Sequence, residues 1–136
     1  MRLARSVRMV ALLGAGLASV AWAAAPAVPN VVRGEGLYNR CLACHALAYD
    51  RVGPRHCGLL GRRAGSVAGF DYSPAMKQSA LVWDEKTLNL FLKKPLALVL
   101  GSSMTYDGVP DAADRTDLVA YLKAANQSTA CGAKAK

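Results

Sequence analysis

The most chemically informative segment of the chain is Cys41-Leu42-Ala43-Cys44-His45. Two cysteines separated by two residues, with a histidine directly after the second, form the attachment signature of a c-type haem. On a helix, residues at i, i+3 and i+4 share one face, so both thiols can reach one porphyrin while the imidazole lies under its iron. The segment therefore predicts one covalently bound haem c, attached through Cys41 and Cys44, with His45 as an axial ligand of the iron.

Zinc binding and thiol–disulfide exchange are the two other functions open to a Cys-x-x-Cys pair. A zinc site needs a second pair of ligands, but the remaining cysteines, Cys57 and Cys131, are single and far apart. A thioredoxin-like redox pair is expected within a βαβ unit, and no strand-like pattern precedes Cys41. Haem attachment is therefore the interpretation that the sequence favours.

A six-coordinate haem needs a second ligand opposite His45, and the candidates are Met76, Met104 and His56. Met104 lies in a polar, glycine-flanked loop, where a methionine has no core to fill, whereas packing explains Met76 in a short helix. His56 lies in a loop, where a histidine is ordinarily exposed. We therefore expect Met104 to be the second ligand. Methionine ligation raises the reduction potential of the iron relative to ligation by two histidines.

The rest of the chain predicts helices and long loops that position these side chains. Residues 46–72 contain too many glycines for a regular element, so we expect a loop wrapped around the haem. No stretch alternates like a strand, and the fold class is therefore all-α. The expected helices are Gly34 to about His45, a short one near Ser73–Ser79, Asp84 to about Lys93 and Asp111 to about Asn126, with one possible turn over Leu96–Leu100.

The first 23 residues read as a secretory signal peptide. A basic start is followed by an apolar run from Met9 to Ala21 and by the A-x-A cleavage site Ala21-Trp22-Ala23. The run is shorter than the roughly 20 residues of a membrane span, and an uncleaved anchor is the alternative interpretation. We therefore expect a periplasmic protein.

The remainder of the chain has the size of one small domain. We expect a mobile leader over residues 24–33, a folded domain over 34–127 and a C-terminal tail over 128–136. The formal net charge of +8 falls when the basic signal peptide is removed. No basic run or interleaving of basic and aromatic residues indicates nucleic-acid binding.

From about Gly34 to Lys123 the chain resembles class I cytochrome c, including its small periplasmic bacterial members. The resemblance implies three main helices, short helical turns and long loops around one covalently bound haem. The shared markers, in chain order, are Cys41-x-x-Cys44-His45, Gly53-Pro54, Gly58-Leu59-Leu60-Gly61-Arg62, Gly69-Phe70-Asp71-Tyr72, Trp83, Leu92, Pro95, Met104 and Asp117-Leu118-Val119-Ala120-Tyr121-Leu122.

The resemblance also implies roles for single residues. Pro54 would offer its carbonyl to the second nitrogen of His45 and so fix the tautomer of the ring. Gly34 and Tyr38 match the glycine and the aromatic residue with which the first helix crosses the last, and Leu92 matches a haem contact. The residues that match the hydrogen-bond partners of the buried propionate are Arg62, Tyr72 and Trp83.

The chain departs from the family at two places. Phe91 stands where many members have a tyrosine that donates to the methionine sulfur. The loss of this hydrogen bond would change the reduction potential of the iron. Most lysines of the exposed haem edge are also absent, with Arg40 the main exception. We therefore expect less electrostatic steering of partners and docking on a more apolar patch. The rim positions are Leu96, Ala97, Ser103, Pro110 and Asp111, and the patch includes Leu96, Leu98 and Tyr106.

Cys57 and Cys131 remain after the haem takes its pair. Two spare cysteines in an oxidising compartment usually form a disulfide, and we predict one between them, with two free thiols as the alternative.

These features favour a one-electron carrier rather than an enzyme, because His45 and Met104 would leave the iron no open position for a small-molecule substrate. The expected partners are redox proteins such as a membrane cytochrome complex, an oxidase or a dehydrogenase. Two alternatives stay open: a haem subunit of a larger dehydrogenase or oxidase complex, and a small peroxidase or ligand-binding haem protein.

Overall fold

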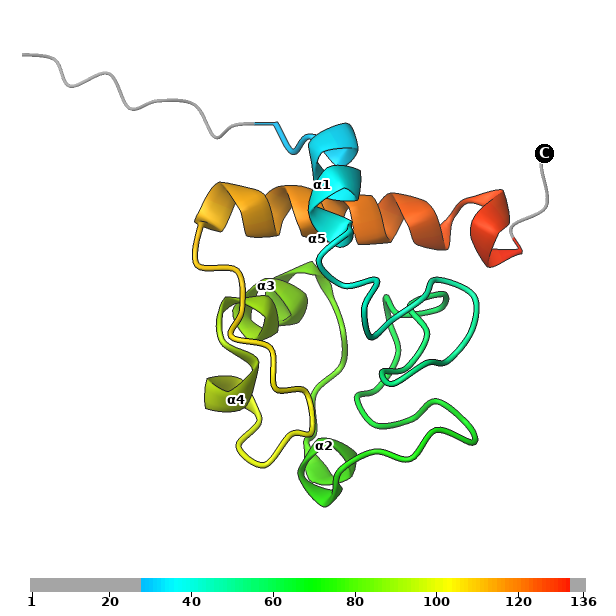
Figure 1. The fold of residues 1–136 in the computed structure, drawn as a ribbon, viewed down its shortest axis with the longest axis vertical. Helices are drawn as coiled ribbons and strands as arrows, with labels where there is room; N and C mark the ends of the chain where they lie inside the picture. The colour runs from blue at the N-terminus through cyan, green and yellow to red at the C-terminus, as the bar shows by residue number, and fades with distance from the viewer. Residues whose placement is uncertain (1–27, 133–136) are drawn as a thin grey trace, which may run out of the picture.

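The structure, a computed structural model, describes residues 28–132. The predicted signal peptide lies outside this range, as do residues 24–27 of the predicted leader and residues 133–136 of the predicted tail. The described residues form helices and long loops (Figure 1), with one isolated bridge between Arg63 and Val82 and no strand. The elements are α1 (Val31–Tyr38), α2 (Pro74–Gln78), α3 (Glu85–Lys93), α4 (Pro95–Leu98), α5 (Ala112–Asn126) and the short 3-10 helix η1 (Thr129–Cys131).

Helix α1 differs from its prediction at both ends. It begins three residues earlier than expected, because the Asn30 side chain accepts a hydrogen bond from the Arg33 amide at 2.9 Å. It ends at Tyr38 rather than at the haem motif, because residues 39–44 form separate turns. The Cys41 amide, for example, donates to the Tyr38 carbonyl at 2.8 Å. The prediction of one continuous helix carrying the motif was therefore wrong.

The other helices begin and end close to their predicted positions because local capping defines them. Ser73 caps α2 and Asp111 caps α5, each accepting a hydrogen bond from a first-turn amide. Asp84 and Thr87 form a reciprocal capping box at the start of α3. Pro95 lies in the first turn of α4, one residue beyond the C-cap of α3. None of the described helices is long and apolar enough to cross a membrane.

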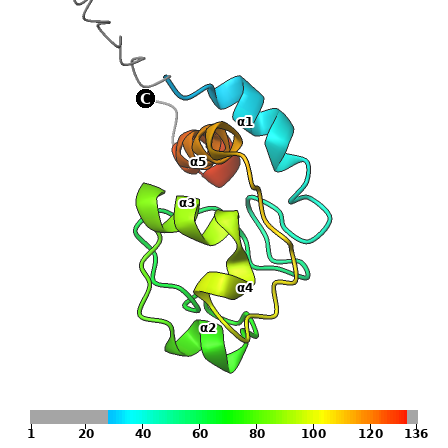
Figure 2. The same cartoon turned by 90° about the vertical axis from the view of Figure 1, so that its left-hand side faces the viewer.

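Helices α1 and α5 cross closely, which both views of the ribbon show (Figures 1 and 2). A Cβ added at Gly34 would overlap the carbonyl oxygen of Asp117 and lie 2.8 Å from the Tyr121 Cβ. Beside this crossing, the Arg33 guanidinium pairs with Asp114 and, at 2.8 Å, with the buried Asp117. Glycine at position 34 is therefore required by the approach of the two helices.

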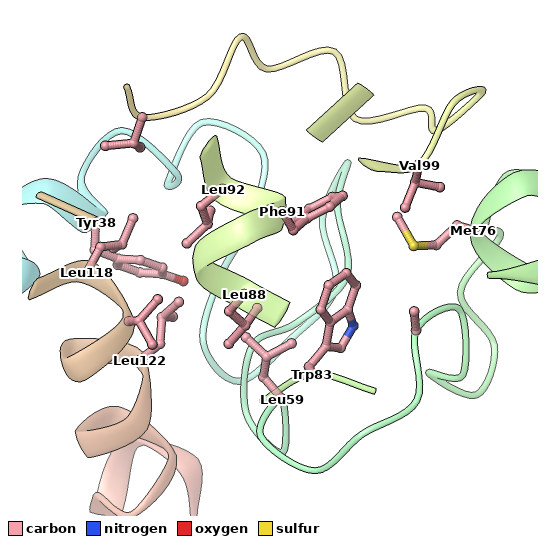
Figure 3. Close-up of a cluster of buried hydrophobic side chains, with 13 residues drawn as sticks. Tyr38, Leu59, Met76, Trp83, Leu88, Phe91, Leu92, Val99, Leu118 and Leu122 are labelled. Atoms are coloured by element: carbon pink, nitrogen blue, oxygen red, sulfur yellow. The ribbon is translucent and has the colours of Figure 1, made fainter. Parts of the chain in front are cut away.

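Helix α3 lies below α5 in Figures 1 and 2, and its side chains lie at the centre of the hydrophobic core shown in Figure 3. One face of α3 buries Leu88, Phe91 and Leu92. The Phe91 ring lies 5.0 Å from the Trp83 ring, measured between centroids. The remaining buried side chains labelled in Figure 3 come from α1, α5, α2 and the loops: Tyr38, Leu118, Leu122, Met76, Leu59 and Val99.

We predict that Gly34→Ala destabilises the protein by about 3 kcal/mol, because the added methyl group would overlap backbone of α5. Gly36→Ala is the matched control, because a Cβ there meets nothing within 4 Å. Guanidinium unfolding followed by circular dichroism measures both variants. Equal stability of the two variants would show that the helices do not cross as described.

A second prediction concerns pH and the start of α3. Hydrogen bonds from the Thr87 amide and hydroxyl lower the pKa of Asp84 below its usual value. A lowered pKa in the folded state stabilises the protein above the unfolded-state pKa, and this contribution is lost as the pH falls through the folded-state pKa. We expect Asp84→Asn to be less stable than wild type at neutral pH and equally stable in strong acid. Unfolding curves over this pH range test it, and a difference that is independent of pH would contradict it.

Candidate functional site

The Cys41–His45 segment forms a single tight turn that follows α1. The amides of Cys44 and His45 both donate to the Cys41 carbonyl, at 3.1 and 2.8 Å. The side chains of residues i, i+3 and i+4 therefore share one side of the turn, although the segment is not part of a longer helix. The turn gives the spatial relation that the motif requires.

Cys41 and Cys44 do not form a disulfide in the part of the chain that the structure describes. Burial raises the pKa of the Cys41 thiol to about 11, and the nearby Arg40 opposes this only in part. A thiol–disulfide redox pair uses a cysteine with a lowered pKa, because the thiolate is the attacking species. Cys41 thus lacks the lowered pKa that is typical of the attacking cysteine in such a pair.

The predicted ligand His45 is buried, with 8% of its surface exposed. Its Nδ1 lies 2.7 Å from the Pro54 carbonyl oxygen, so this nitrogen carries the proton and donates it. Nε2 is then the ring nitrogen with a free lone pair. Burial lowers the pKa of His45, and the bond to Pro54 opposes this shift. The imidazole therefore stays neutral and presents Nε2 for coordination.

Gly53 completes the environment of this ring. Its amide donates to the Cys44 carbonyl at 2.7 Å. A Cβ added at Gly53 would overlap Cε1 of His45 and lie 2.6 Å from Nε2 and 2.7 Å from Nδ1. The backbone of this loop is thus packed directly against the imidazole, and glycine is required for the close approach.

The structure brings the predicted propionate partners Arg62, Tyr72 and Trp83 together. The Trp83 amide donates to the Arg62 carbonyl at 2.9 Å, and Trp83 is buried. Burial raises the pKa of the Tyr72 phenol, and the guanidinium of Arg62 lies near enough to oppose this rise.

Two nitrogens of Arg62 donate to the carbonyls of Cys57 and Arg55, at 3.1 and 2.9 Å. Arg62 Nε is buried and has no hydrogen-bond partner among the described residues. Such an atom is costly unless a further acceptor binds there.

Met104 lies in the loop between α4 and α5, partly buried against the hydrophobic core. The composition of this loop suggested that it is solvated, but the structure shows that it is partly buried. Ser102 within it is 8% exposed and accepts a hydrogen bond from the Met104 amide at 3.2 Å. The Val109 amide donates to the carbonyl of the buried Leu92 at 2.8 Å and ties the loop to α3. Ser102 is a residue at the site that the sequence analysis missed.

The two other methionine and histidine candidates lie elsewhere. Met76 is 8% exposed and belongs to the hydrophobic core, as its helical position suggested. His56 is not an exposed loop residue, which corrects our expectation. Its ring stacks on His45, with 4.3 Å between the ring centroids, so it lies beside that ligand rather than opposite it. Its burial was not predictable, because the contact joins residues that only the fold brings together.

Cys57 and Cys131 form a disulfide in the structure, with 5.2 Å between their Cα atoms. It joins the loop that contains Pro54 and His56 to η1, directly after α5. No cluster of His, Cys, Asp or Glu that could hold a metal ion occurs among the described residues.

Comparison with known proteins identifies relatives over most of the chain. Cytochrome c2 of Rhodomicrobium vannielii is 41% identical over 117 residues, which cover 83% of this chain and 91% of the relative. Cytochrome c2 of Blastochloris viridis is 37% identical, and the match covers 82% of this chain and 91% of that relative. The structure of cytochrome cH from Methylobacterium extorquens matches with a TM-score of 0.68 and 35% identity, over 70% of this chain and 98% of that one. No protein-family model matches the chain.

The chain therefore belongs to the class I cytochrome c family, and its fold is the all-α fold of that family. It is a monohaem c-type cytochrome that acts as an electron carrier, with one covalently bound haem c and its iron as cofactor. The residues present fit this cofactor. The chain offers a neutral imidazole with a free Nε2, two cysteines without a disulfide in the adjacent turn, and a buried Arg62 Nε that lacks an acceptor.

We predict that Gly53→Ala destabilises the holoprotein by about 1–3 kcal/mol, because the new methyl group would displace the His45 ring or its loop. Gly36→Ala makes the same substitution in open space and serves as the control. Guanidinium unfolding of the holoprotein, followed by haem absorbance, measures the difference. Wild-type stability of Gly53→Ala would show that the loop is not packed on the ring.

Proposed function

We propose that Cys41 and Cys44 hold the haem through thioether bonds and that His45 and Met104 ligate its iron. The observation that carries this assignment is the hydrogen bond from His45 Nδ1 to the Pro54 carbonyl at 2.7 Å. This bond fixes one tautomer and the direction of Nδ1, as is usual for histidines that ligate metals. It also leaves Nε2 as the coordinating atom on the side of the turn that carries both cysteines.

The bound haem supplies a one-electron redox couple, whose potential depends on ligand identity, hydrogen bonding and burial. The role of the chain is to keep the surroundings of the iron constant between the two oxidation states. Val109 and Ser102 restrain the Met104 loop through hydrogen bonds to α3 and within the loop. With His45 and Met104 as ligands the iron has no position for a substrate, and we infer that the protein is a carrier and not an enzyme.

We further propose that Arg62, Tyr72 and Trp83 surround a propionate and that Leu92 contacts the porphyrin. Support comes from the buried Nε of Arg62, which needs an acceptor that the described residues do not supply. A carboxylate is the acceptor that a buried guanidinium favours most strongly. Leu92 is buried on the core-facing side of α3, at the level where the Met104 loop is tied to that helix.

The proposed partners are redox proteins, reached in the periplasm after export by the signal peptide over residues 1–23. Leu96 and Leu98 on α4 are each 39% exposed, and Leu100 directly after them is 87% exposed. The neighbouring loop contributes Tyr106, which is exposed in part. This apolar patch supports docking with little electrostatic steering, in contrast to a rim of lysines.

Replacement of the methionines tests the assignment of the second ligand. We predict that Met104→Ala abolishes the methionine–ferric charge-transfer band, because the sulfur no longer reaches the iron. Met76→Ala is the matched variant, and it should keep the band while it loses about 2–5 kcal/mol of stability from the core. An absorption spectrum of each oxidised holoprotein gives the answer. Survival of the band in Met104→Ala, or its loss in Met76→Ala, would overturn the ligand assignment.

A further inference from the structure

We propose that His56 is a positioning residue for His45, stacked on the ligand ring and itself oriented by Tyr38, and that it contributes in this way to the reduction potential of the iron. The inference rests on the proposed function, since it takes His45 to be an axial ligand.

The first observation is the ring stack. The His45 and His56 centroids are 4.3 Å apart, and the ring planes are inclined by 22°. The bond to Pro54 holds one nitrogen of His45, and the Gly53 backbone packs close to the ring. A nearly parallel ring on its face adds a contact that opposes rotation of the imidazole about its bond to Pro54. Together these contacts restrain the plane of the imidazole, which the Pro54 hydrogen bond alone does not determine.

The second observation is that several elements hold His56 in place. The Tyr38 hydroxyl lies 3.0 Å from His56 Nδ1, and Tyr38 is 3% exposed at the end of α1. The His56 amide donates to the Ala46 carbonyl at 3.0 Å, and its carbonyl accepts from the Asn126 side chain on α5 at 3.1 Å. The next residue, Cys57, is anchored by the disulfide to Cys131. The fold therefore dictates the direction of the His56 ring.

The third observation concerns the polarity of His56. Its imidazole is a polar ring that lies directly against the ring of the ligand. A polar environment favours the more highly charged ferric state, and an apolar environment favours the ferrous state. Replacement of the imidazole by an apolar side chain should raise the reduction potential.

The test uses His56→Leu, Tyr38→Phe and the double variant, with Tyr121→Phe as the matched control. Tyr121 packs on Tyr38, with 5.2 Å between centroids, but within residues 28–132 it forms no ring pair or side-chain hydrogen bond with His56. Two properties of the holoprotein are measured: the midpoint potential, and the hyperfine-shifted haem methyl resonances of the ferric protein, which follow the orientation of the axial imidazole plane. A variant that is merely less stable would move neither property.

We expect His56→Leu to change the reduction equilibrium constant at least threefold in favour of the ferrous state, which is about 28 mV for one electron. It should also redistribute the haem methyl resonances. Tyr38→Phe should redistribute these resonances as well, and it should have no further effect when added to His56→Leu, because Tyr38 acts through His56. Tyr121→Phe should leave both properties at wild-type values.

Wild-type potential and resonances in His56→Leu would overturn the inference, as would additive effects of His56→Leu and Tyr38→Phe. If His56→Leu does not fold, His56→Gln replaces it: glutamine keeps an acceptor for Tyr38 but no ring, and an unchanged resonance pattern would again refute the role. Failure of the proposed function is distinguishable from these outcomes. In that case His45→Gln would keep the wild-type haem spectrum, whatever the His56 variants show.

Discussion

The hydrogen bond from His45 Nδ1 to the Pro54 carbonyl is the interaction on which the site depends. It commits one nitrogen of the imidazole and so determines which nitrogen remains for the iron. The Pro54 carbonyl is held in place because its loop is hydrogen-bonded to the motif and to the residue that follows it. The Gly53 amide donates to the Cys44 carbonyl, and the His56 amide donates to the Ala46 carbonyl. The loop and the motif, which are only a few residues apart in the sequence, therefore form one structural unit.

The pair of crossing helices holds this unit in place from two sides. Helix α1 leads directly into the Cys41 turn, and its position is set by the close contact of Gly34 with α5. Helix α5 reaches the loop through Asn126, whose side chain bonds both the Leu59 amide at 2.8 Å and the His56 carbonyl at 3.1 Å. The disulfide adds a covalent connection between the same two regions. The packing of α1 on α5 thus helps to hold the loop and the motif that surround His45.

Local signals made much of the fold predictable. The predicted starts of three helices, near Ser73, Asp84 and Asp111, were correct, because the caps that define them act within one turn. The end of α1 was not predictable in this way: the predicted helix continued through the motif, but the chain turns at residues 39–44. His56 was also misjudged, since its environment comes from Tyr38 on α1 and His45 in the motif rather than from its loop neighbours.

The sequence by itself determined the class of protein, because the chemistry of Cys-x-x-Cys-His is complete within five consecutive residues and needs no distant partner. It also indicated the family's roles for Pro54, Arg62 and Met104. Only the tertiary structure decided what surrounds the ligand: the stacking of His56 on His45, the buried Arg62 Nε without an acceptor and the packing of Gly53 on the imidazole. These features depend on the relative placement of separate loops and helices, which packing of the whole chain fixes and no local pattern encodes.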